Sequence, residues 1–215
     1  MLDVVIVGAG GFGREILGWL WQCFSPDEYR LKGFLARAGD EHNLSDFDVE
    51  VGVIGDPESY EPHDNERFIL AIGGMEARRR TVEALALRGA QFLTMIHPTA
   101  VVAESAKIGE GVVLYPFVTV SNEADLDCFV HLSLYASAGH DARIGRFCLL
   151  SPYSTLNGFA VLDDEVFMGS HSMVGPGHSV GRESRISANT SVLHDVPAIS
   201  FVHGVPGRST KRAMF

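Results

Sequence analysis

A six-residue repeat dominates the second half of the sequence. Residues 100–195 divide into sixteen consecutive six-residue units without an insertion, and the third residue of every unit but one is a bulky aliphatic residue or Met. These third residues are Val102, Ile108, Leu114, Val120, Leu126, Leu132, Ala138, Ile144, Leu150, Leu156, Leu162, Met168, Val174, Val180, Ile186 and Val192. An unbroken period of six fits neither an amphipathic helix nor an alternating strand, and it is typical of stacked coils. The repeat predicts a left-handed parallel β-helix.

The period also predicts which residues become neighbours. With three units in each coil, residues eighteen positions apart lie above one another, separated by about 4.8 Å, the spacing of adjacent strands. The first residues of the units are mostly small, so one bulky side chain per unit points inward. The outward positions of successive coils therefore form columns on the surface of the β-helix.

One unit departs from this pattern. Its bulky third residue shrinks to Ala138, and His140 and Asp141 fill its outward fifth and sixth positions. Asn122 lies eighteen residues before His140 and Gly158 eighteen after it, so the stacking rule places a bare backbone N–H beside the imidazole. A general base next to a donor for a developing oxyanion is the pair that acyl transfer requires. The alternative is a histidine at a coil corner, with an exposed ion pair worth about 0–1 kcal/mol.

The first part of the chain follows a different pattern. Residues 2–7 form an apolar run typical of a buried strand, and residues 14–22 carry an apolar helical stripe. The glycines between these two segments are Gly8, Gly10, Gly11 and Gly13. A strand, a Gly-rich turn and a helix open a Rossmann-type βαβ unit, in which the helix N-terminus favours a phosphate group.

Further elements are expected before the repeat begins. Strands are predicted over 31–35 and 67–72, and a basic helix over 76–88. The chain before the repeat is too short for the six strands of a full dinucleotide-binding domain, so it forms half of one. Where an NAD-binding protein places an acidic residue for the ribose, this chain has Ala36 and Arg37, which disfavours a dehydrogenase.

Charge and composition exclude several classes of protein. Asp and Glu number 27 against 17 Lys and Arg, a net charge of -10 that argues against nucleic-acid binding. No segment approaches the roughly 20 apolar residues of a membrane span, and the N-terminus lacks the basic start of a signal peptide, so a cytoplasmic location is expected. Cys23, Cys128 and Cys148 show no metal-ligand spacing and are interpreted as reduced packing residues.

In its motifs the chain resembles the bacterial sugar O- and N-acyltransferases, which include sialic-acid O-acetyltransferases and UDP-4-amino-sugar N-acetyltransferases of glycan pathways. The motifs are the Gly-rich loop, a strand ending in residues 71–73, a junction at residues 96–100, the repeat with its His–acid pair, and a terminal Gly-Val-Pro at residues 204–206. The resemblance covers essentially the whole chain. It implies a Rossmann-like domain that binds a nucleotide sugar over 1–96 and a left-handed β-helix acetyltransferase domain with a C-terminal tail over 97–215.

The resemblance also implies a reaction. Acetyl would pass directly from acetyl-CoA to the sugar through a tetrahedral intermediate, with no covalent enzyme intermediate and no metal. His140 would act as the general base, Asp141 would orient and polarise its imidazole, and the N–H of Gly158 would bind the thioester oxygen.

Family members bind acetyl-CoA in the groove between adjacent β-helices of a trimer, and the resemblance therefore implies a homotrimer. The implied contacts to acetyl-CoA come from Ser170 and Ala188 along the groove, with the basic Arg208 and Lys211 near the nucleotide end. The family's catalytic chemistry would then be shared between subunits.

The Gly-rich loop of the family holds the nucleotide of the sugar substrate. The residues expected to bind that substrate here are Gly8, Gly10, Gly11, Gly13, Arg37, Gly73 and Ser133. Three departures from the family bear on specificity: Phe12 replaces a usual His, Ala36-Arg37 replace a usual Asp-Asp, and Leu149 replaces a second His. The first two departures disfavour UDP as the nucleotide carrier, and the third indicates a different acceptor pocket. The carrier and the acceptor group, amine or hydroxyl, stay open.

Two alternatives are kept beside the acyltransferase. A hexapeptide-repeat protein can serve as a non-catalytic scaffold, since fold alone does not give function. An NAD-dependent oxidoreductase is a second alternative. His194 and Asp195 repeat the His–acid pair three coils from His140, about 14 Å away, and are assigned a capping or surface role.

Overall fold

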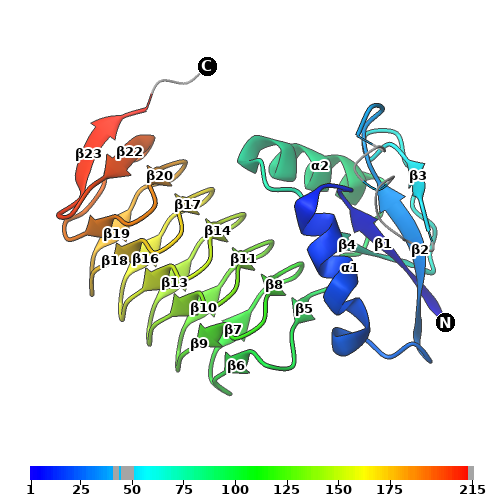
Figure 1. Ribbon diagram of the computed structural model, residues 1–215, viewed down its shortest axis with the longest axis horizontal. Coiled ribbons are helices and arrows are strands. Elements are labelled where there is room, and N and C mark those ends of the chain that lie inside the picture. The colour runs from blue at the N-terminus through cyan, green and yellow to red at the C-terminus, as the bar shows by residue number, and fades with distance from the viewer. Residues whose placement is uncertain (41–43, 45–50, 213–215) are drawn as a thin grey trace. The chain divides into compact units, whose positions relative to one another are not determined.

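The computed structural model describes residues 1–40, 44 and 51–212. The chain divides into two compact units, Met1–Met95 and Ile96–Phe215. The first unit contains the helices and a small sheet, and the second contains the stacked coils (Figure 1). No helix in these described residues is long and apolar enough to cross a membrane.

The first unit is built on a parallel sheet of four strands in the order β3-β2-β1-β4. Its elements are β1 (Leu2–Val7), α1 (Gly11–Cys23), β2 (Tyr29–Leu35), β3 (Val53–Gly55), β4 (Glu66–Leu70) and α2 (Met75–Leu87). The central strand β1 is buried from residue 3 onward, as expected for a strand with a neighbour on both sides. The predicted half of a Rossmann domain is confirmed.

Helix α1 begins at Gly11, three residues before the start predicted from its apolar stripe. The reason is a close approach between the helix and the end of β1. A Cβ on Gly13 would lie 2.0 Å from the carbonyl oxygen of Gly8, so only glycine fits there. Gly8 itself has a φ of 120°, in the left-handed region that favours glycine. The Gly-rich segment is therefore a short loop followed by the first turn of the helix.

Ion pairs occupy the amino ends of strands β1 and β4. The nearly buried Glu66 accepts hydrogen bonds from Lys32 and from Tyr60, the latter at 2.7 Å, and Arg30 donates to Asp3 at 2.8 Å. Burial acts to raise the pKa of Glu66, but the hydrogen bond from Lys32 and its other donors lower it overall. These contacts stabilise the sheet at the amino ends of its strands. Ligands of such sheets bind at the opposite, carboxyl ends of the strands.

The second unit is a parallel β-helix in which each six-residue unit supplies one two-residue strand. Its faces form a five-stranded, a six-stranded and an eight-stranded sheet, visible as three stacks of short arrows (Figure 1). The five-stranded sheet consists of β7 (Lys107–Ile108), β10 (Asp125–Leu126), β13 (Arg143–Ile144), β16 (Val161–Leu162) and β19 (Ser179–Val180). The six-stranded sheet consists of β6 (Val101–Val102), β9 (Thr119–Val120), β12 (Ser137–Ala138), β15 (Thr155–Leu156), β18 (Met173–Val174) and β21 (Ser191–Val192).

The eight-stranded sheet extends beyond the repeat. It consists of β5 (Met95–Ile96), β8 (Val113–Leu114), β11 (His131–Leu132), β14 (Leu149–Leu150), β17 (Phe167–Met168), β20 (Arg185–Ile186), β22 (Ser200–His203) and β23 (Arg208–Lys211). Strand β23 is antiparallel to β22, so the coils end in a hairpin. Strand β22 pairs with β20, so the hairpin extends the eight-stranded sheet past the repeat.

The predicted stacking rule holds in the strand register. Ser137 pairs with Thr155 and Ala138 with Leu156, an offset of eighteen residues. From Leu114 to the end of the repeat, every third-position side chain is at most 2% exposed, which confirms the predicted core. The last residue of every unit from 111 to 189 has a φ between 55° and 71°. This left-handed residue turns the chain at each corner and leaves the preceding fifth residue at the corner tip.

Candidate active site

His140 and Asp141 lie at the corner between strands β12 and β13, where the six-stranded sheet turns into the five-stranded sheet. Nδ1 of His140 is 2.9 Å from Oδ2 of Asp141. An ionised carboxylate can only accept hydrogen bonds, so Nδ1 carries the proton, and in the neutral imidazole Nε2 keeps its lone pair. The His140 side chain is 62% exposed, which leaves Nε2 accessible for taking a proton from a substrate.

The coils on either side hold the backbone of this corner. Asp141 donates its N–H to the carbonyl oxygen of Asn122 at 3.0 Å, and His140 accepts the N–H of Phe159 at 2.9 Å. Asn122 thus contacts this corner through its backbone carbonyl. The corner thus presents His140 from a backbone fixed on both sides.

Gly158 lies directly against the imidazole. A Cβ on Gly158 would lie 2.5 Å from Nε2 and 2.6 Å from Cε1 of His140, so a larger residue has no room while the ring stays in place. Gly158 is partly exposed, and its N–H has no acceptor among the residues that the structure describes. The structure therefore brings together the three residues that the sequence assigns to catalysis: a histidine with a free Nε2, its carboxylate partner and an adjacent unpaired backbone donor.

These groups open into a hollow of about 640 Å³ on the outside of the six-stranded sheet. Besides His140 and Gly158, its polar lining includes Thr119, Ser121, Ser137, Thr155 and Asn157. The ring of Phe159 meets the imidazole edge to face, with 5.1 Å between centroids and an interplanar angle of 86°. The motif analysis missed Phe159, although its place nineteen residues after His140 puts it one coil further on at the next corner position.

The residues expected to bind acetyl-CoA lie elsewhere on the same chain. Ser170 and Ala188 occupy the corners between the eight-stranded and six-stranded sheets, and Ser133 lies on that edge too, nearly buried. Arg208 and Lys211 are exposed on β23. Within one chain the six-stranded sheet therefore separates this edge from the edge that bears the imidazole.

A ladder of stacked rings runs along the edge of Ser170. Its members are Phe117, Tyr135, Tyr153 and His171, with 4.9, 4.8 and 4.8 Å between successive centroids. The three phenyl and phenol rings are about half exposed. Their spacing of eighteen residues could have revealed the ladder in the sequence.

A separate cavity of about 250 Å³ lies at the carboxyl ends of the strands in the first unit. Four of the residues expected to bind the substrate line it: Gly8, Gly10, Arg37 and Gly73. Gly11 and Gly13, in the first turn of helix α1, do not line it. Asp40, Pro57, Ala77 and Thr81 also line the cavity and were not expected. Motif spacing could not find them, because they come from segments outside the Gly-rich pattern.

Arg37 is held at this cavity by an ion pair with Glu58, at 2.8 Å between Nη2 and Oε1. Arg80 of α2 approaches the same carboxylate oxygen at 3.5 Å. Both partners of the Arg37–Glu58 pair are about half exposed, so the pair is weak but directs the guanidinium. Arg37 is consequently a donor group beside the Gly-rich loop.

The second His–acid pair suggested by the sequence does not form. Asp195 accepts the N–H of Ser179 at 2.8 Å, a hydrogen bond that lowers the pKa of Asp195, and its Oδ1 lies 3.7 Å from Nδ1 of His178. Asp195 therefore faces His178 rather than His194. The arrangement at His140 is not repeated three coils away.

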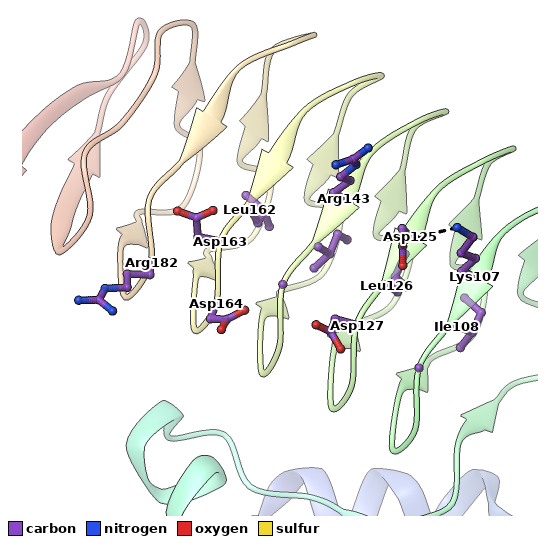
Figure 2. Close-up of a pocket in the computed structure, with 13 residues that line it drawn as sticks. Lys107, Ile108, Asp125, Leu126, Asp127, Arg143, Leu162, Asp163, Asp164 and Arg182 are labelled. Atoms are coloured by element: carbon purple, nitrogen blue, oxygen red, sulfur yellow. Dashed lines mark ion pairs between the residues drawn. The ribbon is translucent and has the colours of Figure 1, made fainter.

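A further hollow, of about 560 Å³, follows the five-stranded sheet. Figure 2 shows Lys107, Asp125 and Arg143 in a row along it, with Lys107 and Asp125 joined by an ion pair of 4.0 Å. None of the residues that line it is a histidine or cysteine, so it offers no base comparable to an imidazole. Within residues 1–40, 44 and 51–212, no group of three or more His, Cys, Asp or Glu could hold a metal ion.

Comparison with known proteins gives a family match in the first unit and a curated relative. Residues 3–85 match the PglD N-terminal domain family. The chain is 30% identical over 139 residues to GDP-perosamine N-acetyltransferase of Escherichia coli O157:H7, a match that covers 63% of this chain and 61% of that enzyme. The chain thus spans about three fifths of the length of this curated relative.

Two solved structures match over nearly the whole chain. The acetyltransferase domain of PglB from Neisseria gonorrhoeae FA1090 has a TM-score of 0.87 at 24% identity, covering 98% of this chain and 100% of that one, which shows the fold. PerB from Caulobacter crescentus, solved with CoA and GDP-perosamine, has a TM-score of 0.84 at 27% identity and covers 97% of both chains. The resemblance to bacterial sugar acyltransferases is confirmed, and the chain is homologous to the perosamine N-acetyltransferases.

The contact between Gly158 and the imidazole can be tested by adding one methyl group. Gly158→Ala is expected to rotate the His140 ring away from Gly158, because the new Cβ would lie 2.5 Å from Nε2. A crystal structure of the variant would show the ring displaced and its hydrogen bond to Asp141 lengthened. The melting temperature should stay nearly constant, since the exposed ring can turn into water. Gly18→Ala, where a Cβ meets nothing, is the control. An unmoved ring would contradict the packing described.

Proposed function

We propose that this homologue of nucleotide-sugar N-acetyltransferases transfers an acetyl group from acetyl-CoA to an amino group of a nucleotide-linked sugar, in the synthesis of a surface glycan. The observation that carries the proposal is the free Nε2 of His140 beside the unpaired N–H of Gly158. The sequence left amine and hydroxyl acceptors open. The names of the relatives, N-acetyltransferases, favour the amine.

In the proposed reaction, Nε2 of His140 removes a proton from the acceptor nitrogen as that nitrogen attacks the thioester carbonyl carbon. The N–H of Gly158 donates to the oxyanion of the tetrahedral intermediate. Asp141 stabilises the imidazolium through Nδ1–H. The C–S bond then breaks, and Nε2–H returns the proton to the departing thiolate. A positioned base contributes about 10²–10⁴ in rate and an oxyanion donor about 10²–10³.

We further propose that three copies of the chain form the working enzyme. The edge with His140 and the edge with Ser170 and Ala188 lie on opposite sides of the six-stranded sheet, so one acetyl-CoA molecule cannot follow both on one chain. A second copy can present its Ser170 edge to the first copy's imidazole, and such a head-to-tail contact closes after three copies. Light scattering is expected to give three times the mass of one chain, and a monomer at micromolar concentration would contradict a shared site.

We place the nucleotide of the sugar substrate in the cavity lined by Gly8, Gly10, Arg37 and Gly73. Support comes from the helix N-terminus beside the Gly-rich loop, which attracts phosphate, and from the guanidinium at the rim. The relatives' substrate, GDP-perosamine, makes GDP one carrier to test. The cytoplasmic location expected from the sequence stays a prediction, which cell fractionation would test.

The catalytic assignment predicts the effect of removing the imidazole. His140→Ala is expected to lower kcat by about 10²–10⁴, the contribution of a positioned base, without changing the oligomeric mass. Release of free thiol from acetyl-CoA would be followed with GDP-, UDP- and dTDP-linked amino sugars. His194→Ala, on the same edge but away from the hollow, should retain activity. Unchanged turnover in His140→Ala would refute the assigned base, and a wild-type protein inactive on every sugar would favour the scaffold.

The cavity assignment predicts a change in substrate affinity. Gly10→Val should raise the KM for the nucleotide sugar about tenfold, because Gly10 lines the cavity and a side chain there meets no protein atom within 4 Å, so it extends into the nucleotide's space. The KM for acetyl-CoA and the melting temperature should not change. Gly52→Val is the matched control, since its Cβ also meets nothing but does not line the cavity. Equal KM values for both variants would argue against this location.

A further inference from the structure

Most aromatic rings at the corners of the β-helix stack on rings of the neighbouring coil. Phe117, Tyr135, Tyr153 and His171 form one such column, and Phe129 and Phe147 form another, with 5.2 Å between centroids and an interplanar angle of 7°. These columns stabilise the stack of coils by ring-on-ring packing. Phe159 belongs to neither column.

Phe159 shares the backbone conformation of those rings but not their surroundings. Its φ is 60°, like the others, yet the same position holds Asp141 one coil before and Gly177 one coil after. The ring is 59% exposed, and its recorded ring contact is with the imidazole of His140. An exposed apolar ring without a partner in its own column adds little to the core, so its contact with His140 calls for another explanation.

The imidazole has few other restraints. With the His140 side chain 62% exposed, burial does not fix the ring. The hydrogen bond to Asp141 holds Nδ1 but lets the ring pivot, and Gly158 lies against the end of the ring that carries Nε2, Cε1 and Cδ2. The Phe159 ring contacts the imidazole at an interplanar angle of 86° and blocks rotation of the imidazole in one further direction. An aromatic pair in this geometry shifts a rotamer balance by about three- to tenfold.

We propose that Phe159 is a positioning residue that keeps Nε2 of His140 beside the N–H of Gly158, in the orientation needed to take the proton from the acceptor nitrogen. This inference rests on the proposed acetyl transfer, and Phe159 acts through the imidazole rather than on the reacting atoms. The ring also lines a hollow of about 410 Å³ next to Asp141, on the other side of the corner. Direct contact with the sugar is therefore the competing role.

Kinetics of ring-deleting and ring-keeping variants separate these roles. Phe159→Leu is expected to lower kcat about three- to tenfold, with both KM values within twofold of wild type, because binding surfaces persist while the base loses orientation. Phe159→Tyr keeps the ring and should restore kcat to within twofold. Trp21→Leu is the control for the loss of an exposed ring, because Trp21 is 45% exposed on α1 and lines neither the hollows at the His140 corner nor the cavity of the first unit, and it should match wild type. A raised KM for the sugar at unchanged kcat would overturn the proposal in favour of direct contact.

A second measurement does not depend on turnover. In protein carrying ¹⁵N- and ¹³C-labelled histidine, the signals of His140 are assigned by their loss in His140→Ala. Wild type should show a single tautomer with the proton on Nδ1, and Phe159→Leu should show exchange between tautomers and altered shifts of the ring protons. Unchanged His140 signals in Phe159→Leu would overturn the inference. An inactive wild-type protein with altered signals would instead reject the proposed transfer while retaining the positioning contact.

Discussion

The left-handed residue at each corner of the β-helix is the constraint on which the rest of the second unit depends. Every unit from residue 111 to 189 ends in it, so every coil closes after eighteen residues and the columns stay in register. For residues other than glycine this conformation costs about 1–2 kcal/mol each. Buried third-position side chains and the parallel hydrogen bonds between coils offset that cost. The register places Gly158 against His140, and a single inserted residue between them would separate the base from the donor.

The same regularity distributes the proposed chemistry over two edges of one sheet. The imidazole stands on one edge, while Ser170, Ala188 and the ring ladder stand on the other. A rigid prism cannot fold its own edges together, so a molecule that touches both must lie between copies. The exposure of His140 in a single chain is consistent with the proposed trimer, in which a second copy would cover this edge.

The first unit depends on a different constraint, the close approach of a helix to the end of a strand. Gly13 lets α1 pass the carbonyl of Gly8, and the cavity beside them opens at the carboxyl ends of the strands while ion pairs hold the amino ends. Arg37 stands where an NAD-binding domain has its ribose acid, and it is fixed by Glu58. A cationic donor at that place suits a phosphate or a base with acceptor groups better than a ribose diol.

The sequence by itself determined the β-helix, its register and the half Rossmann domain, because a fixed period and a strand–glycine–helix order dictate which backbone segments pair. It also brought His140 and Gly158 together, since both lie in one column. Only the tertiary structure decided where α1 begins, which histidine Asp195 faces, and that Phe159 meets the imidazole. Those outcomes depend on side-chain rotamers and close contacts at the corners, and a period specifies the column of a residue but not the direction in which its side chain points.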